Sequence, residues 1–142
     1  MPRMIFLNLA VADLARSTAF YTGLGFSLNP DYSSPDCSCV AISETIVVML
    51  LTRDRFADFT AGPVSDPQDG TAAILCLSAG NRAEVDDLVA RALALGGRPW
   101  LDTMSDGPMY GHSFADPDGH VWEIAHNPFW PLDDDGSLTL PG

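Results

Sequence analysis

The feature that most constrains the fold of this chain is an order of elements that occurs twice. Each half begins with an apolar segment typical of a β-strand, continues with a capped helix that ends at glycine, and finishes with three short strand-like segments. The first copy covers residues 4–52 and the second covers residues 71–126. The repeat therefore predicts an α+β chain built from two β-α-β-β-β modules.

The two helices carry the clearest signals. Asp13 is a good N-cap for a helix that runs to about residue 21, where glycines follow. Asn81 caps the second helix, and Glu84 stands three residues later, as in a capping box. Apolar residues then recur at helical spacing until the glycine pair at 96–97. Each predicted helix therefore has a defined start and a defined end.

The size of the modules predicts how they are arranged. One module is too small to bury both sides of a four-stranded sheet, so the two should pack together or against a partner chain. With the helices outside, eight short strands of mixed direction could form a half-open curved sheet whose inner face encloses a cavity. We expect one domain over residues 1–142, in which residues 53–70 link the modules and residues 127–142 form a tail.

The charge of the chain excludes two classes of partner. Its 7 basic and 19 acidic residues give a formal net charge of −12, which repels the phosphates of nucleic acids and anionic membrane surfaces. No basic segment precedes an apolar run near the N-terminus, and no apolar stretch reaches the roughly 18 residues of a membrane span. We expect a cytoplasmic protein with no nucleic-acid or membrane partner.

The three cysteines favour the same compartment. Their number is odd, and the spacing Cys37-x-Cys39 differs from that of the usual zinc-binding pairs. In a strand this spacing places both thiols on one side. We expect Cys37, Cys39 and Cys76 to be reduced, structural thiols.

Residues 114–124 combine a tight turn with a carboxylate in the middle of a strand. Pro117 fixes φ early in the turn, Asp118-Gly119 tolerates positive φ, and apolar segments flank both sides, which predicts a β-hairpin. Glu123 then lies in mid-strand. Apolar and polar alternation could place this carboxylate on a solvent face, or it could line a cavity.

Two motifs at opposite ends of the repeat carry a family resemblance. The first is Asn8-Leu9-Ala10-Val11-Ala12-Asp13-Leu14, followed by Phe20-Tyr21 and Leu24-Gly25-Phe26. The second is Asp116-Pro117-Asp118-Gly119, with Glu123 four residues beyond the glycine. Together they resemble the opening and the close of the glyoxalase/bleomycin resistance protein/extradiol dioxygenase (vicinal oxygen chelate) superfamily. The resemblance implies paired modules that form a half-open barrel around a divalent metal or a bound drug, in a homodimer.

The residues depart from the metal site that the resemblance implies. Enzymes of the superfamily usually place His, Gln or Glu ligands on the first and last strands of both modules. Here the first-strand positions fall at Phe6 and near Ala73, and the last strand of module one, residues 47–51, offers no hard ligand. Glu123 is the one surviving ligand position. We expect no tightly bound metal, and at most a weakly bound divalent ion.

His112 is the candidate partner of Glu123. If the turn contains an even number of loop residues, antiparallel pairing places the two side chains on one sheet face. Such a pair could perform general acid/base catalysis, because a carboxylate orients an imidazole, or it could be a structural cross-strand pair. Asn8 either forms hydrogen bonds in the pocket or is a buried, satisfied amide. The candidate ligand pocket has five residues: Asn8, Met49, Tyr110, His112 and Glu123.

Two functions of different classes remain open. The first is a binding protein of the bleomycin-resistance type, which holds a small organic molecule in an apolar cavity without a tightly bound metal. The second is a glyoxalase-like, metal-dependent lyase or isomerase that uses Glu123 and His112. The missing metal ligands favour the first, and the acidic charge would suit a cationic ligand.

Overall fold

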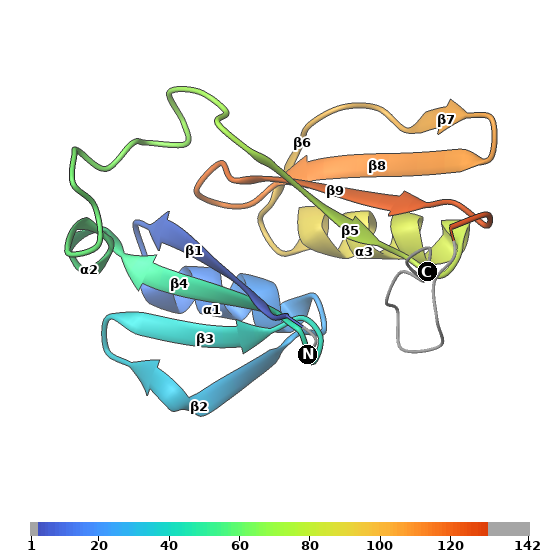
Figure 1. Cartoon of the computed structure of the whole chain (residues 1–142). Coiled ribbons are helices and arrows are strands. Elements are labelled where there is room, and N and C mark those ends of the chain that lie inside the picture. Colours follow the sequence, from blue (N-terminus) through green and yellow to red (C-terminus); the bar gives the residue numbers. More distant parts are fainter. Residues whose placement is uncertain (1–2, 131–142) are drawn as a thin grey trace.

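The computed structural model describes residues 3–130, which form two β-α-β-β-β modules, as the repeat predicts (Figure 1). Module one contains β1 (Ile5–Val11), α1 (Leu14–Gly23), β2 (Ser27–Ser34), β3 (Cys37–Ala41) and β4 (Ile46–Thr52), and the short helix α2 (Arg53–Ala57) begins the segment that links the modules. Module two contains β5 (Ile74–Ser78), α3 (Arg82–Ala94), β6 (Arg98–Pro99), β7 (Met104–Asp106), β8 (Met109–Ala115) and β9 (Val121–His126). Most of the predicted tail, 127–142, lies outside the described residues.

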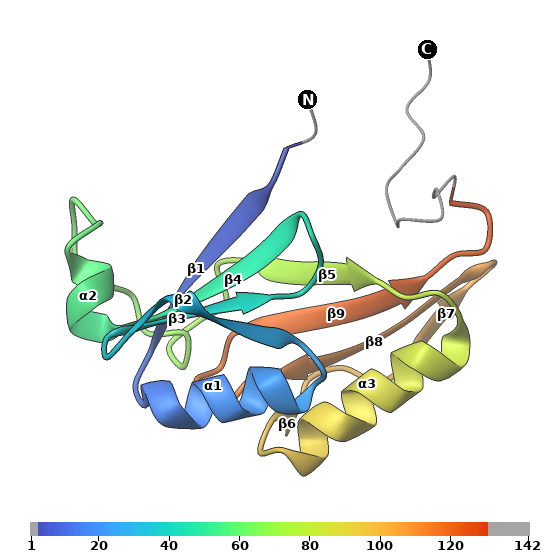
Figure 2. The ribbon, with the colours of Figure 1, turned by 90° about the horizontal axis from the view of Figure 1, so that it is seen from below.

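Each module forms its own mixed sheet. The strand order is β1-β4-β3-β2 in module one and β5-β9-β8-β6 in module two, where β7 also pairs with β8. In both sheets the first strand runs parallel to the last, and the other ladders are antiparallel. Figure 2 shows α1 and α3 in one layer on the same side of the two sheets. The α+β class and the outer position of the helices are therefore confirmed.

Module two differs from the sequence prediction after α3. The pattern predicts a strand over residues 98–101, but β6 comprises only Arg98–Pro99, and the additional strand β7 pairs with β8. Gly107 closes the turn between β7 and β8 with a φ of +59°, a conformation that favours glycine. The sequence of β7, Met-Ser-Asp, has a single apolar residue, so no alternation marks it as a strand.

The predicted N-caps hold both long helices in place. The Asp13 side chain accepts a hydrogen bond from Arg16 N (3.0 Å), and the Asn81 side chain accepts one from Glu84 N (2.8 Å). Glu84 Oε2 accepts from Gly80 N (2.7 Å), one residue before the position that a standard capping box uses. α3 has 13 residues, and none of the helices described is long and apolar enough to cross a membrane.

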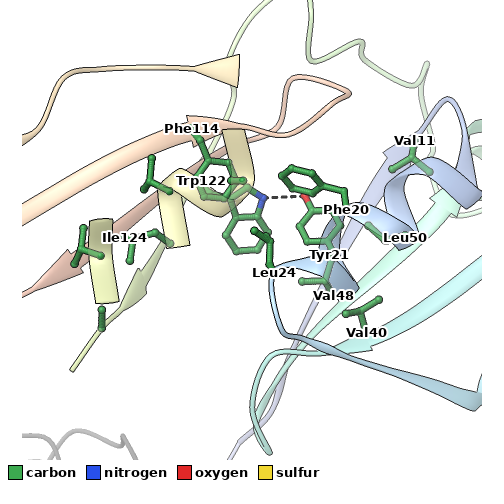
Figure 3. Packing of buried hydrophobic residues seen from close by; sticks show 14 residues of the cluster. Val11, Phe20, Tyr21, Leu24, Val40, Val48, Leu50, Phe114, Trp122 and Ile124 are labelled. Carbon is green, nitrogen blue, oxygen red and sulfur yellow. Dashed lines mark hydrogen bonds between the residues drawn. The ribbon is translucent and has the colours of Figure 1, made fainter. Parts of the chain in front are cut away.

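The main core lies between the helices and the sheets and crosses the module boundary (Figure 3). Tyr21 of α1 packs edge-on against Trp122 of β9, with 5.9 Å between the ring centroids. The ring centroid of Phe20, the neighbouring residue of α1, lies 6.0 Å from that of Phe114 of β8. Because rings from both modules interlock in this way, each module supplies the cover that the other needs.

Candidate functional site

The strand side chains that point away from the helices form a second surface, called here the open face. On module two, three of these residues stand in one row across neighbouring strands: Cys76 on β5, Glu123 on β9 and Ser113 on β8. In the adjacent row the residues of these three strands are small: Ser78, Ala125 and Gly111, and Met104 of β7 pairs with Gly111 at the end of the row. Glu123 therefore borders a strip of small residues that ends at Met104.

The contacts of Glu123 are made on this open face. Cys76 Sγ donates to Glu123 Oε1 at 3.9 Å. A Cβ atom at Gly111 would lie 3.7 Å from the same oxygen and 3.9 Å from Met104 Cε, so glycine leaves room beside the carboxylate. Burial, followed by the negative charge of Glu123 and the hydrogen bond to it, raises the pKa of the Cys76 thiol to about 11. The thiol is therefore a protonated donor at neutral pH.

Glu123 has no cationic partner within residues 3–130. The ion pairs of this part of the chain join Arg16 to Asp118 and Arg55 to Asp58. The Glu123 side chain is half-buried. A half-buried carboxylate that meets only a thiol retains acceptor capacity for a cation or a hydrogen-bond donor from a ligand.

His112 does not lie beside Glu123, so the expected pair is wrong. Ser113 stands opposite Glu123, and His112 stands opposite Ile124. The connection between the paired strands has five residues, 116–120, an odd number, and this register puts the two side chains on opposite sheet faces. His112 shares the core-facing side with Ile124, and its Nδ1 is buried without a hydrogen-bond partner in the described part of the chain.

Tyr110 also belongs to the side of the sheet that faces the helices, so its predicted position in the pocket is wrong. Its hydroxyl donates to Asp86 Oδ1 of α3 at 2.5 Å, and this hydrogen bond is the main reason that the pKa of Tyr110 is raised. The Arg82 guanidinium lies 4.9 Å from the centre of the Tyr110 ring. Tyr110 therefore attaches β8 to α3.

Asn8 and Met49 lie on the open face of module one, where they pair across β1 and β4. Asn8 is exposed, and its Nδ2 donates to Phe6 O at 3.4 Å. The alternative of a buried, satisfied amide at Asn8 is therefore wrong. Met49 occupies in module one the place that Glu123 occupies in module two.

The strand register corrects one predicted position. Phe6 pairs with Val47, two residues before Met49, and Ile74 pairs with Val121, two residues before Glu123. The counterpart of Phe6 in module two is therefore Ile74 rather than Ala73. Its side chain is also apolar and cannot coordinate a metal.

The residues present do not fit the metal site that the resemblance implies. Of the four implied positions, Phe6, Met49 and Ile74 supply no hard donor, and Glu123 supplies one carboxylate. No three His, Cys, Asp or Glu side chains among residues 3–130 are placed to hold a metal ion. A first-row divalent ion needs several nitrogen or oxygen donors, and this set provides too few.

The turn that follows β8 has a structural role that the sequence did not reveal. Asp116 is fully buried, and its Oδ1 accepts from the backbone N–H groups of residues 118, 119 and 120 at 3.0, 2.9 and 2.8 Å. Its Oδ2 accepts from the Tyr21 hydroxyl, which in turn accepts from Trp122 Nε1 (Figure 3). Burial raises the pKa of Asp116 and of Tyr21.

Asp118 continues this attachment to module one. Its Oδ1 accepts from Ala12 N at 2.8 Å and its Oδ2 from Ser17 Oγ at 2.9 Å. The His120 ring is hydrogen-bonded to Ala10 O at 2.8 Å. The sequence indicated the turn chemistry of the two aspartates, but their partners lie about a hundred residues away in the chain, where no local pattern could show them.

A groove of about 1700 Å³ is lined by residues of both modules and reaches the open face at Cys76 and Ser78. Apolar residues from both modules line it, among them Leu24, Ile42, Leu77 and Leu88. Cys76 reaches this groove, but Glu123 does not line it. The candidate site at Glu123 is therefore a feature of the open face.

Comparison with known proteins agrees with this architecture. The model of the Glyoxalase/Bleomycin resistance protein/Dioxygenase superfamily matches residues 3–124. A search of curated proteins gave no match.

Among solved structures, a glyoxalase-related enzyme from Fulvimarina pelagi is 26% identical, with a TM-score of 0.81 and full coverage of both chains. The hypothetical protein SA1046 from S. aureus is also 26% identical, with a TM-score of 0.74, over 89% of this chain and 94% of that chain. A lactoylglutathione lyase from Agrobacterium tumefaciens is 21% identical over 94% of this chain and 100% of that chain, with a TM-score of 0.68. At that identity the likeness concerns the fold alone.

Proposed function

Because this chain belongs to the glyoxalase/bleomycin resistance protein/dioxygenase superfamily, we propose that it binds a small organic molecule on its open face at Glu123, without a tightly bound metal. The observation that carries the proposal is the carboxylate itself. Glu123 lies beside a strip of small residues, and the described residues offer it a thiol but no cation. A ligand would supply the missing partner.

The surroundings of Glu123 favour a ligand with an apolar body and a protonated amine. Apolar side chains border the carboxylate on the open face, including Ile74, Val121 and Met104. A charge-assisted hydrogen bond to a carboxylate is about twice as strong as a neutral one. The net charge of −12 also attracts cations to the protein as a whole.

A homodimer would complete the cavity. Large apolar side chains on the open faces are exposed in the single chain: Phe6 at 53%, Ile74 at 57% and Met104 at 48%. A second copy packed against these faces would bury them and enclose Glu123. The three free cysteines, Cys37, Cys39 and Cys76, suit the reducing cytoplasm.

The glyoxalase-like alternative is less well supported by the geometry than binding is. It requires His112 beside Glu123 and a metal, whereas the two side chains lie on opposite faces of the sheet and the donor set is too small. The open face retains the Glu123 carboxylate beside Cys76 and Ser113. Binding is therefore the function that the geometry supports best.

A thermal-shift screen tests the proposal. The probes are benzylamine-type amines, each with the matching benzyl alcohol, applied to the wild type, Glu123→Gln and the control Asp31→Asn, an exposed carboxylate of module one. We expect amines to raise the Tm of the wild type and the control more than the alcohols do. Glu123→Gln should lose the amine response, because the amide cannot pair with the cation.

Equal amine responses in Glu123→Gln and the wild type would reject the site. Elemental analysis that finds about one zinc, nickel or iron per chain, lost in Glu123→Ala, would reject the metal-free assignment. Isomerase activity on methylglyoxal and glutathione would restore the enzyme alternative. A monomer in sedimentation at micromolar concentration would contradict the dimer.

A further inference from the structure

The open face of module one carries a cluster of sulfur side chains that the proposed function does not use. Cys37 and Cys39 are two residues apart on β3, so both point to the open face. Met49 on β4 pairs directly with Cys39 across the strands. Cys39 is 6% exposed, Cys37 is half-buried, and both are free thiols.

The strand spacing is close to the limit for a disulfide between the two cysteines. Residues i and i+2 of a strand are separated by roughly 6.4–6.8 Å between Cα atoms, at the upper end of the roughly 4.4–6.8 Å found in disulfides. Their side chains also leave the strand in parallel. A metal ion with metal–sulfur bonds of about 2.3 Å can bridge two sulfurs that are up to roughly 4.6 Å apart. Rotation of each side chain about its Cα–Cβ bond can turn the two sulfurs toward one another and bring them within this distance.

The chemistry of the three ligands selects one class of ion. Thiolates and thioethers are soft donors that favour Cu(I), whereas carboxylates and carbonyls favour hard cations. Cross-strand partners have Cβ atoms about 4.5–5.5 Å apart, so the thioether of Met49 can reach an ion held at Cys39. We propose that Cys37, Cys39 and Met49 form a binding site for a soft monovalent metal ion of the Cu(I) class.

Both thiols are protonated before an ion binds, because their surroundings raise the pKa values of Cys37 and Cys39. Burial, then Cys39 and Asp36, raise the pKa of the Cys37 thiol, and Arg55 opposes them. Burial also raises the pKa of Cys39. One Cu(I) ion would displace the two thiol protons and leave a dithiolate complex with one negative charge, near the Arg55 guanidinium. Because protons are released, binding should strengthen as the pH rises.

The test uses the full-length, reduced protein under anaerobic conditions, titrated with Cu(I) and with the redox-inert Ag(I). Native mass spectrometry measures the number of ions per chain, and a Cu(I) chelator provides competition. The variants are Cys37→Ala, Cys39→Ala and Met49→Leu. Cys76→Ala is the matched control, since its thiol lies on the other module. Circular dichroism checks that each variant is folded.

We expect one ion per chain in the wild type and in Cys76→Ala, and none in Cys37→Ala or Cys39→Ala. Met49→Leu should retain the ion less well against the chelator. If Cys39→Ala does not fold, the result for Cys37→Ala decides, because Cys37 is only half-buried. The site is rejected if the wild type takes up no ion, if Cys37→Ala still binds one, or if Cys76→Ala loses it. Equal uptake of Zn(II) by the same residues would overturn the assignment to a soft ion.

Discussion

Asp116 and Glu123 belong to one hairpin, yet their surroundings are opposite. Asp116 is fully buried and accepts hydrogen bonds from three backbone N–H groups and a tyrosine hydroxyl. Glu123, on the following strand, is half-buried and meets one thiol. Both carboxylates belong to the motif by which the sequence resembles its superfamily, but the first joins the modules and the second faces the open surface.

The contrast shows that two carboxylates of one motif can have different roles, one in folding and one in function. A buried carboxylate is tolerated only when its acceptor positions are filled, and such a group stabilises the fold. A carboxylate with unfilled acceptor positions on an accessible face has capacity left for a ligand. The two roles predict different responses to mutation.

The largest expected effect is that of Asp116→Ala. The change leaves the N–H groups of residues 118 and 120 and the Tyr21 hydroxyl without their acceptor in a site closed to water, whereas the N–H of Gly119 keeps its hydrogen bond to the carbonyl oxygen of residue 116. Each unsatisfied buried group costs about 1–3 kcal/mol, so we expect the free energy of unfolding to fall by about 3 kcal/mol or more. Urea unfolding followed by circular dichroism measures this loss.

Glu123→Ala is the matched control and should cost about 0.5 kcal/mol or less, as for a carboxylate outside the core. If Asp116→Ala does not fold, Asp116→Asn supplies a milder comparison, because the amide keeps one acceptor oxygen. Similar losses of unfolding free energy from the Asp116 and Glu123 variants would contradict the assignment of different roles to the two carboxylates.

The second effect concerns the bond between the modules. Tyr21→Phe removes the hydroxyl that donates to Asp116 Oδ2 and accepts from Trp122 Nε1 at 2.9 Å. Hydrogen bonds to charged groups contribute about 1.5–3 kcal/mol, so we expect a loss of about 2 kcal/mol in the same unfolding experiment. Tyr110→Phe, which loses a hydroxyl bonded to Asp86 at the surface, should cost less. Equal losses from the two tyrosines would contradict a special role of the Tyr21 hydroxyl in joining the modules.

Glu123→Gln should change stability least, and it tests the surroundings of Glu123 on the open face most directly. The charge of Glu123 and its hydrogen bond contribute to raising the pKa of Cys76 to about 11. Without the charge this pKa should fall, although burial keeps it above the ordinary value of 9.0. Each unit of the fall gives about tenfold more thiolate at a pH below the pKa.

Alkylation of Cys76 by iodoacetamide between pH 7 and pH 10 measures the shift, in a Cys37→Ala, Cys39→Ala background so that one thiol reacts. The rate should rise with pH in both proteins and be faster in Glu123→Gln at each pH. Superimposable profiles would show that the carboxylate does not act on the thiol.

The fold could be predicted because its signals are local. Asp13 and Asn81 cap their helices through side chains that reach residues three positions away, and apolar periodicity marks the buried sides of the elements. The sequence did not predict β7, because a strand of three mostly polar residues has no apolar periodicity. The strand β7 forms because its backbone pairs with that of β8.

The site was harder to predict because it depends on register. Glu123 and Met49 lie on the open faces, whereas Tyr110 and His112 lie on the core-facing side of β8. A five-residue rather than an even-numbered connection made this difference, since a shift of one residue turns every side chain to the other face.

The sequence by itself determined the two modules, their helices and the hairpin that carries Glu123, because these follow from contacts between near neighbours in the chain. Only the tertiary structure decided that Asp116 and Asp118 join the modules while Glu123 remains open to a ligand. Tyr21, Ser17 and Ala12, which satisfy the aspartates, lie about a hundred residues away in the chain. Which carboxylate finds its partners within the protein is settled when the modules pack, since burial and distance set the free energy of each group.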